Sequence, residues 1–376
     1  MKVMDITPYY HQNSGGIKTY LNNKIKWLED KDIEHVVVIP GERERIYYFR
    51  KTKFYEVSSF KLIGEYRFFK SLIEINDIIS EEKPDVVELG GTYLLIPFLK
   101  RRDYILSVFY HADAEKEIEL LPLPKKLKRE FFKFVIEKCL AQADVLLVSS
   151  QKYERILRQF GLSKVFYTPL GIDVELFTPL KYDPSFRRRF GIKEDVFLLL
   201  YVGRLSPEKG IKNLLKAFSI LDPACFHLII VGKGPLEFLI EYYKKNLSNL
   251  TYISYLSHDE LSFVYASADI FVSASKFETF GFSFLEAEAS GLPVCAFDLD
   301  LETQFIKEIL AKERTPENLA EKIIQATKLL SPNLRKDLYE KVKFNFSLDK
   351  TFKRIFQVYT NLMYLICQDN FQALKL

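Results

Sequence analysis

The stretch FLLLYVGRLSPEKGIKNLLKAFSIL (197–221) contains the unit from which the fold can be predicted. It begins with bulky apolar residues, as in a strand that is buried on both faces of a sheet. A turn with Gly, Ser and Pro follows, and then apolar residues recur at the spacing of an amphipathic helix. Strand, turn and helix in this order form the repeating unit of a parallel α/β sheet.

The same unit recurs along the chain. The strands predicted in the first half are 2–6, 35–39, 85–89, 104–110, 144–150 and 165–169, with helices at 18–31 and 68–83. The strands predicted in the second half are 197–203, 227–232, 250–255, 269–275 and 293–298, with helices at 210–221, 236–247 and 258–268. Alternation of this kind indicates parallel sheets covered on both faces.

The periodicity lapses between residues 169 and 186, where Pro, Gly and Asp cluster. A chain of 376 residues is too long to fold around one small hydrophobic core. We therefore predict an α/β protein with two doubly wound, Rossmann-like domains that face each other across a cleft, an N-terminal domain of residues 1–170 and a C-terminal domain of residues 171–350. Ligands of such sheets bind beyond the carboxyl ends of the strands, which places the expected site in the cleft.

Composition excludes several classes of protein. Hydrophobic residues make up 48% and charged residues 28%, as in a globular protein, and a net charge of +4 is too mild for a dedicated nucleic-acid binder. No run approaches the roughly 20 apolar residues of a membrane span, and MKVMDITPYY lacks the apolar core of a signal peptide. We expect a cytoplasmic protein. Its four cysteines are far apart, which favours buried free thiols over a metal site or disulfides.

Two cations bracket the turn of the stretch quoted above. Arg204 follows the strand, Lys209 lies five residues later, and between them Pro207 suits a first helical turn with Ser206 as its cap. At the carboxyl end of a strand both cations are placed to reach a diphosphate. The alternative is that both are solvated surface charges, which is the usual state of Lys and Arg.

Glycines follow several predicted strands. Gly15 and Gly16 precede the first helix, while Gly203 and Gly232 end two strands of the second half. Because glycine has no Cβ, it lets main-chain amides approach an anion, so these residues are candidates for phosphate contact. A tight turn that simply requires glycine is the alternative. His111 also follows a strand directly and is a candidate cleft residue, although a lone histidine is more often structural.

The segment KFETFGFSFLEAEASGLPV (276–294) contains two glutamates around an aromatic centre. Glu278 precedes a predicted helix and Glu286 lies in its first turns, so they do not share one helix face. Between them Phe280–Phe282, with Gly281, offers free amides at a helix N-terminus, which is a ready anion site. Carboxylates beside such a site are better suited to accept hydrogen bonds from sugar or ribose hydroxyls than to hold phosphate.

This segment resembles the E-x7-E signature of retaining glycosyltransferases with the GT-B fold. The segments PLGIDVELFTP, VGRLSPEKG, VGKGP and SHDEL also resemble, in order and spacing, those of glycosyltransferase family 4, the group 1 transferases. The resemblance covers most of the chain and is best in the second half. It implies a metal-independent, retaining hexosyltransferase that uses a nucleotide sugar such as a UDP-, GDP- or ADP-sugar, with no further cofactor.

The resemblance also implies roles for individual residues. Glu286 would bind the ribose and Glu278 the transferred sugar, while Arg204 and Lys209 would neutralise the diphosphate together with the amides of Phe280, Gly281 and Phe282. His111 would contact the donor sugar near the reacting carbon. Gly16, beside Gly15, would let the first domain close over the phosphates. Backbone near Tyr255 and Leu256 would form the base pocket. The helix at 351–376 would return to the first domain.

One region departs from the family pattern. Family members usually carry a glycine-rich turn and a longer loop after the strand at 293–298, whereas no glycine follows Leu292 here. The segment LETQFIKEIL is instead expected to run almost directly into helix, which could alter donor choice or speed. Asp298-Leu299-Asp300 has the form of a DxD metal motif, but its place directly after a strand favours ordinary loop chemistry.

The segment LPKKLKREFFKFVIEKCL (123–140) predicts a basic amphipathic helix. Docking to an anionic membrane, at its inner face, would suit a lipid-linked acceptor. The alternative is a helix of the first domain whose aromatic residues face the sheet. For the whole chain, the alternatives to a transferase are a non-catalytic nucleotide-sugar or glycan-binding protein and a GT-B sugar-nucleotide epimerase. Donor base, donor sugar, acceptor and linkage are not encoded in a recognisable pattern.

Overall fold

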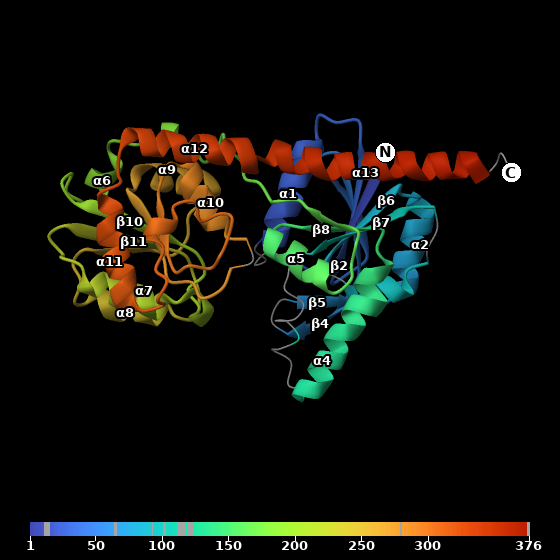
Figure 1. The fold of residues 1–376 in the computed structure, drawn as a ribbon, viewed down its shortest axis with the longest axis horizontal. Coiled ribbons are helices and arrows are strands. Elements are labelled where there is room, and N and C mark those ends of the chain that lie inside the picture. The colour runs from blue at the N-terminus through green and yellow to red at the C-terminus, as the bar shows by residue number, and fades with distance from the viewer. Residues whose placement is uncertain are drawn as a thin grey trace. The chain divides into compact units, whose positions relative to one another are not determined.

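The computed structural model describes residues 1–10, 16–63, 66–91, 93–100, 103–110, 118, 123–278 and 280–373. The chain divides into two compact units. Unit 1 comprises Met1–Leu170 with Leu348–Leu376, and unit 2 comprises Gly171–Ser347. Each unit is a largely parallel sheet with helices packed on it, which confirms the expected class of two α/β domains (Figure 1).

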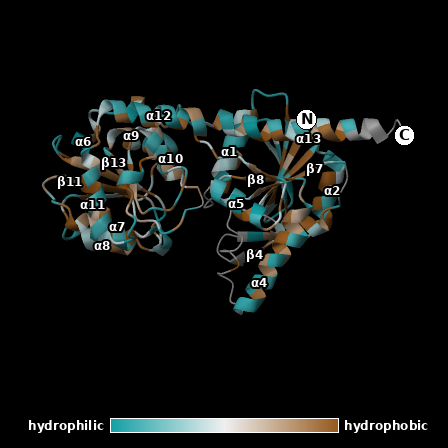
Figure 2. Ribbon diagram, in the orientation of Figure 1, coloured by the Kyte–Doolittle hydropathy of each residue, from teal (hydrophilic) through white to brown (hydrophobic). Residues whose placement is uncertain are grey.

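Unit 1 contains a nine-stranded sheet in the order β3-β4-β2-β1-β6-β7-β8-β9, with β5 paired to β4. Its strands are β1 (Lys2–Ile6), β2 (Glu34–Gly41), β3 (Arg45–Phe49), β4 (Thr52–Ile63), β5 (Tyr66–Phe69), β6 (Val86–Gly90), β7 (Ile105–Tyr110), β8 (Val145–Val148) and β9 (Val165–Tyr167). All neighbours are parallel except β3 and β5, which run antiparallel to β4. The six predicted strands form the parallel part together with β4, which pairs with β2 and was not predicted. Apolar residues of these strands are buried on both faces of the sheet, and the strands are largely hydrophobic (Figure 2).

The antiparallel part was not predicted, and it corrects the helix expected at 68–83. Phe68 and Phe69 belong to β5, so the helix α2 (Leu72–Glu82) begins later, at a cap where Ser71 Oγ accepts a hydrogen bond from the Glu74 amide at 3.2 Å. Strand β3 carries mostly exposed side chains. It therefore lacks the apolar run that marks a buried strand.

Helices α1 (Gly16–Leu28) and α13 (Leu348–Ala373) pack together in unit 1. The Trp27 ring stacks on Phe356 at 5.3 Å, and its Nε1 donates to Asp349 Oδ1 at 3.1 Å. The other helices of unit 1 are α2, α4 (Lys125–Phe134) and α5 (Gln151–Gln159), with a π-helical turn at Val135–Cys139 and 3₁₀ turns at Tyr93–Phe98 and Leu140–Gln142. Figure 1 shows α4 projecting from the body of unit 1. The basic helix expected at 123–140 is thus an α-helix that ends in a wider, buried turn.

A buried charged cluster, named here the Lys24 cluster, ties these elements together. Lys24 Nζ lies 2.9 Å from Asp5 Oδ1 and 3.0 Å from Glu88 Oε2, and all three side chains are almost inaccessible to solvent. Glu88 also accepts hydrogen bonds from the hydroxyls of Tyr20, at 2.9 Å, and Tyr359. Strands β1 and β6, helix α1 and helix α13 are therefore joined by one fully partnered network.

Unit 2 contains a five-stranded parallel sheet in the order β12-β11-β10-β13-β14. Its strands are β10 (Phe197–Val202), β11 (Phe226–Val231), β12 (Leu250–Ile253), β13 (Ile270–Ser273) and β14 (Val294–Ala296). Its helices are α6 (Phe186–Arg189), α7 (Ile211–Ile220), α8 (Glu237–Lys244), α9 (His258–Ser267), α10 (Phe282–Ala289), α11 (Pro316–Thr327) and α12 (Pro332–Phe346), with 3₁₀ turns at Pro179–Lys181, Pro207–Lys209 and Lys307–Ile309. Helix α7 contacts α8 and α11, while α10 contacts α9 and α12.

The four cysteines are free thiols. Cys139 and Cys295 are buried as expected, but Cys225 and Cys367 are exposed, which corrects the expectation for those two. Within the described part of the chain, no helix combines the length and the apolar character that crossing a membrane requires.

Candidate active site

The loop after β10 carries the two predicted cations, Arg204 and Lys209. Lys209 lies in a short turn that is separate from the next helix. The segment Pro207–Lys209 is a 3₁₀ turn, and Gly210 separates it from α7. Ser206 does not cap this turn through its side chain, since its hydroxyl donates to the Glu208 carboxylate instead. The expectation that Ser206 caps the helix through its side chain is therefore wrong, and the turn at Pro207 is not continuous with α7. Arg204 is exposed.

Lys209 meets Glu278 although 69 residues separate them. Its Nζ lies 2.6 Å from Glu278 Oε1, and the two side chains keep 26% and 13% of their surface exposed. Strands β10 and β13 are parallel neighbours, so the loops that follow them emerge at the same edge of the sheet. One predicted cation and one predicted carboxylate thus share a half-buried site, with surface left for a ligand.

The N-terminus of α10 lies on the segment that follows Glu278. Gly281 precedes the helix with φ 83°, a conformation that favours glycine. The first amides of a helix have no intrahelical acceptor, so those of Phe282 and Ser283 are available to an anion, whereas the Phe284 amide already donates to the Gly281 carbonyl at 3.0 Å. Phe280 is buried, and its carbonyl accepts a hydrogen bond from Thr303 Oγ1 at 2.7 Å.

Glu286 lies on the second turn of α10 and has a different partner from Glu278. Its Oε2 accepts a hydrogen bond from the Tyr265 hydroxyl at 2.9 Å. Burial raises the pKa of Glu286 to about 7, although the bond from Tyr265 acts in the opposite direction. A carboxylate with one phenol partner and a pKa near neutrality can exchange that environment for ligand hydroxyls.

Gly203 and Gly232 lie against each other at the ends of β10 and β11. A Cβ on Gly232 would fall 1.9 Å from the Gly203 carbonyl oxygen, and Gly232 has φ 145°. Close packing of the two backbones therefore requires glycine at position 232, whereas a Cβ on Gly203 would meet the Tyr201 hydroxyl at 2.9 Å. Phosphate contact by either glycine stays a prediction.

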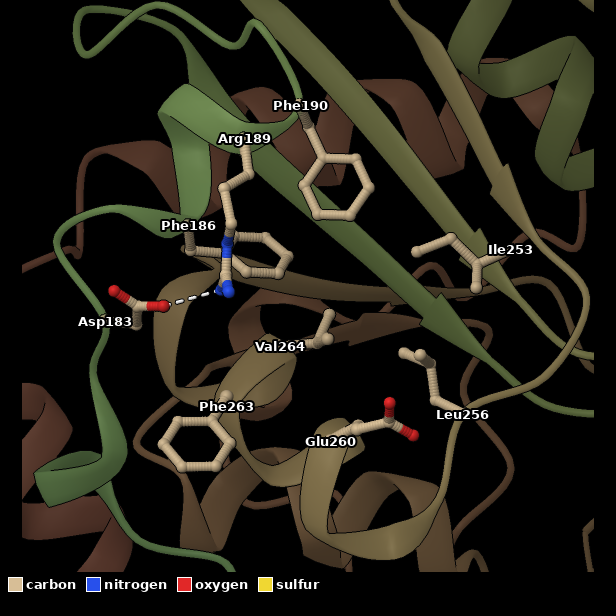
Figure 3. A pocket seen from close by; sticks show the side chains of 9 residues that line it. All are labelled: Asp183, Phe186, Arg189, Phe190, Ile253, Leu256, Glu260, Phe263 and Val264. Atoms are coloured by element: carbon tan, nitrogen blue, oxygen red, sulfur yellow. Dashed lines mark hydrogen bonds and ion pairs between the residues drawn. The ribbon is translucent and has the colours of Figure 1, made fainter.

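The predicted base-binding residues follow β12. Tyr255 is 70% exposed, whereas Leu256 lines a pocket of about 340 Å³. Figure 3 shows Phe186, Phe190 and Ile253 around the same pocket, with the Asp183–Arg189 ion pair on one side. The pocket is largely apolar and suits a flat or aliphatic group.

Several predictions fall elsewhere. His111 and Gly15 lie outside the described residues, and Gly16 is the first residue of α1 in unit 1. Asp298 and Asp300 lie in a loop. No group of three or more His, Cys, Asp or Glu side chains that could hold a metal ion occurs among the residues that the structure describes.

The segment after Asp298 corrects an expectation. It does not run directly into helix but forms a loop, a 3₁₀ turn at Lys307–Ile309 and a bridge between Phe297 and Ala311. Helix α11 begins only at Pro316.

Sequence reasoning missed three side chains around α10. They are Tyr265, which holds Glu286, Thr303, which holds the Phe280 carbonyl, and Glu288, which accepts from the Phe305 amide at 2.9 Å. Burial raises the pKa of Glu288 well above its usual range. A polar residue inside an apolar helix, as Glu288 is in FSFLEAEA, was the available signal.

Comparison with known proteins agrees with this architecture. Residues 183–343 match the family model described as "Glycosyl transferases group 1", and residues 14–176 match that described as "Glycosyltransferase Family 4". A GDP-mannose-dependent alpha-mannosyltransferase of Corynebacterium glutamicum is 26% identical over 305 residues, covering 78% of this chain and 71% of that protein.

Two further similarities extend over most of the chain. A GDP-mannose-dependent alpha-(1-6)-phosphatidylinositol dimannoside mannosyltransferase of Mycobacterium tuberculosis is 22% identical, covering 81% of this chain and 82% of that protein. The structure of sucrose-phosphate synthase from Thermosynechococcus elongatus superposes with a TM-score of 0.80 at 19% identity, covering 97% of this chain and 99% of that one. The chain therefore belongs to the group 1, family 4 glycosyltransferases, nucleotide-sugar-dependent enzymes with the GT-B fold.

Proposed function

We propose that this chain is a retaining, metal-independent hexosyltransferase that moves a sugar from a nucleoside-diphosphate donor to a glycan or lipid-linked acceptor. The observation that carries the proposal is the half-buried Lys209–Glu278 pair, which precedes the N-terminus of α10 along the chain. A cation beside free helix amides suits a diphosphate, and a carboxylate beside that cation suits the hydroxyls of the sugar attached to it.

In this proposal each group either stabilises developing charge or orients part of the donor. As the glycosidic bond breaks, negative charge develops on the leaving diphosphate. Lys209, Arg204 and the amides of Phe280, Gly281 and Phe282 face that charge. Glu278 orients the transferred hexose and Glu286 orients the ribose. The leaving phosphate accepts the proton of the acceptor hydroxyl on the face that it leaves, so no protein nucleophile is needed. His111 contributes near the reacting carbon.

The donor to test first follows from the relatives. Both mannosyltransferases described above are named for GDP-mannose. We therefore take GDP-mannose as the starting candidate, with UDP- and ADP-sugars as comparisons. Tyr255 and Leu256 are proposed to border the base.

A lipid-linked acceptor is favoured by the surface of α4. Leu127 and Phe134 are 53% and 43% exposed on this helix, and Lys125, Lys126 and Arg129 are exposed on the same helix. Apolar side chains among cations suit the surface of an anionic bilayer. The relative named for phosphatidylinositol dimannoside acts on a lipid of this kind according to its name. We propose peripheral contact with an anionic membrane through residues 123–140.

A thermal-shift panel with GDP-mannose and with UDP- and ADP-sugars in EDTA tests the proposal. We expect one donor to raise the melting temperature, and we expect Glu286→Ala to lose most of that shift. If no donor stabilises the chain, the donor site is wrong. If stabilisation and donor hydrolysis require added Mn²⁺, the metal-independent mechanism is wrong and Asp298 and Asp300 must be reconsidered.

A further inference from the structure

The loop that follows β14 contains polar side chains with almost no exposed surface. Thr303 is 0% and Gln304 1% exposed, and Glu288, on the helix that they face, is 0% exposed. Buried polar groups in a surface loop are costly unless each has a partner. Their partners show what the loop holds in place.

Gln304 braces the loop internally. Its Oε1 accepts a hydrogen bond from the Leu299 amide at 3.0 Å, and its Nε2 donates to the Phe297 carbonyl at 2.8 Å. Asp300, which follows Leu299, adopts φ 54°, a left-handed conformation in which Asp is tolerated better than most residues. One side chain thus closes a turn that contains no glycine.

Thr303 connects this loop to the start of α10. Its hydroxyl donates to the Phe280 carbonyl at 2.7 Å. The Phe280–Gly281 peptide is planar and trans, so its carbonyl and the Gly281 N–H point in opposite directions. Fixing the carbonyl toward the buried hydroxyl therefore directs the Gly281 N–H away from the protein interior at Thr303.

Two more contacts make the arrangement stiff. The Phe305 amide donates to Glu288 Oε1 at 2.9 Å, which attaches the loop to α10 a second time. A Cβ on Gly281 would lie 3.1 Å from Thr303 Oγ1 and 3.1 Å from the Phe284 ring, so Gly281 fits closely between these side chains. The loop and the first turn of α10 are held as one body.

We propose that Thr303, braced by Gln304, is a positioning residue for the donor diphosphate. It acts through the Phe280–Gly281 peptide, whose N–H it directs toward the anion at the N-terminus of α10. The inference rests on the proposed function, because it concerns the same diphosphate. It also gives a role to the loop after β14, which contains no glycine. The Thr303 side chain of this loop fixes the geometry of the turn before α10.

Matched substitutions at position 303 test this role. Thr303→Val keeps the shape and removes the hydroxyl, Thr303→Ser keeps the hydroxyl, and Thr303→Ala removes it without adding a methyl group next to Gly281. The probes are GDP, UDP and ADP, each compared with its nucleoside, titrated calorimetrically into the full chain in EDTA. The melting temperature of each ligand-free variant is measured in parallel.

We expect Thr303→Val and Thr303→Ala to bind the nucleoside diphosphate about tenfold more weakly while affinity for the nucleoside is unchanged. Thr303→Ser restores diphosphate affinity. A purely structural role would lower the melting temperature and leave the ratio of diphosphate to nucleoside affinity as in the wild type, which would overturn the inference.

The two proposals fail in different ways. If the wild type binds a nucleoside diphosphate, Glu286→Ala weakens it and Thr303→Val does not, the donor site stands and the positioning role is wrong. If the wild type binds none of the three diphosphates, both are wrong. Should Thr303→Val fail to fold, the Ala and Ser variants give the same comparison.

Discussion

Two lysine–carboxylate groups, one in each unit, differ in burial and in the number of their partners. In the Lys24 cluster of unit 1 the lysine is 0% exposed and contacts both Asp5 and Glu88. In unit 2 the Lys209 side chain is 26% exposed and pairs with Glu278. A lysine with every donor used inside the protein serves the fold, whereas one with accessible surface can bind a ligand. Burial and partners, rather than residue type, separate the two roles.

The pKa values within the Lys24 cluster follow from its burial and from its partners. In the Lys24 cluster burial acts against the charged forms, but the pKa of Asp5 is held well below its usual range by Lys24 and His35, and that of Lys24 is raised by the two carboxylates. Burial raises the pKa of Glu88 to about 7, and Asp5 adds to this. The cluster therefore keeps its principal ion pair across a wide pH range.

The largest expected effect is loss of the Lys24 cluster. Lys24→Met leaves Asp5 and Glu88 buried without their cation, which is expected to cost about 3–5 kcal/mol of unfolding free energy. Urea unfolding followed by circular dichroism measures this loss. Lys125→Met, on exposed α4, is the control and should change stability by less than about 0.5 kcal/mol. Equal stability of the two variants would contradict the structural role.

The next effect concerns Lys209. Lys209→Ala is expected to lower kcat/KM for the donor about 10²–10³-fold, or about 2.7–4 kcal/mol, because charge on the leaving diphosphate loses its partner. Its melting temperature should stay near that of the wild type, since Glu278 keeps some access to solvent when the cation is removed. Lys212→Ala, an exposed lysine on α7, is the matched control. An activity loss no larger than that of the control would place the diphosphate elsewhere.

A smaller effect is the pH dependence of donor binding. Ribose hydroxyls bind the ionised form of Glu286, whose pKa is raised to about 7. Affinity for the nucleoside diphosphate should therefore rise about tenfold from pH 6 to pH 8 and then level off. Glu286→Gln should bind more weakly and remove this rise. Calorimetric titration at four pH values measures it, and an unchanged profile in Glu286→Gln would contradict the assignment.

The same carboxyl affects stability with the opposite trend. Folding favours its protonated form because its pKa in the folded chain lies above the ordinary value of 4.5. Its contribution is thus most favourable below pH 4.5 and is lost as the pH rises toward 7. Ligand-free Glu286→Gln should gain stability relative to the wild type at pH 8 and lose that advantage near pH 4.5.

The smallest effect concerns membrane contact. Lys126→Gln on α4 should weaken binding to vesicles of phosphatidylglycerol about fivefold, which is about 1 kcal/mol per cation at an anionic surface. Sedimentation with vesicles measures it, and Lys336→Gln, exposed on α12 of unit 2, is the control. Vesicles of neutral phosphatidylcholine should bind neither protein. Equal binding by both variants would leave α4 without this role.

Much of the fold could be predicted because parallel strands buried on both faces, such as β2 and β10, are continuous apolar runs. The β3–β5 ribbon could not, since aromatic and charged residues mix along it and no clean period results. The Lys24 cluster was also missed. Asp5 and Glu88 lie within apolar strands, and the lysine that both of them contact, Lys24 on helix α1, is 19 positions from Asp5 and 64 positions from Glu88.

The candidate site was predictable to a similar extent. The motifs indicated Lys209 and Glu278 separately, and the family resemblance assigned both to one donor, but their direct contact follows only from the adjacency of β10 and β13. Thr303 and Gln304 carry no sequence signal, because their role depends on backbone groups that a loop presents only after folding.

Hydrogen–deuterium exchange of the full chain with and without its nucleoside diphosphate tests the contrast between the two units most directly. We predict that the ligand protects amides in the segments 203–210 and 280–286 of unit 2, and that exchange in β1 and β6, around the Lys24 cluster, is unchanged. The account would be contradicted if the ligand changed exchange in neither segment of unit 2, or if the protected amides lay mainly around the Lys24 cluster.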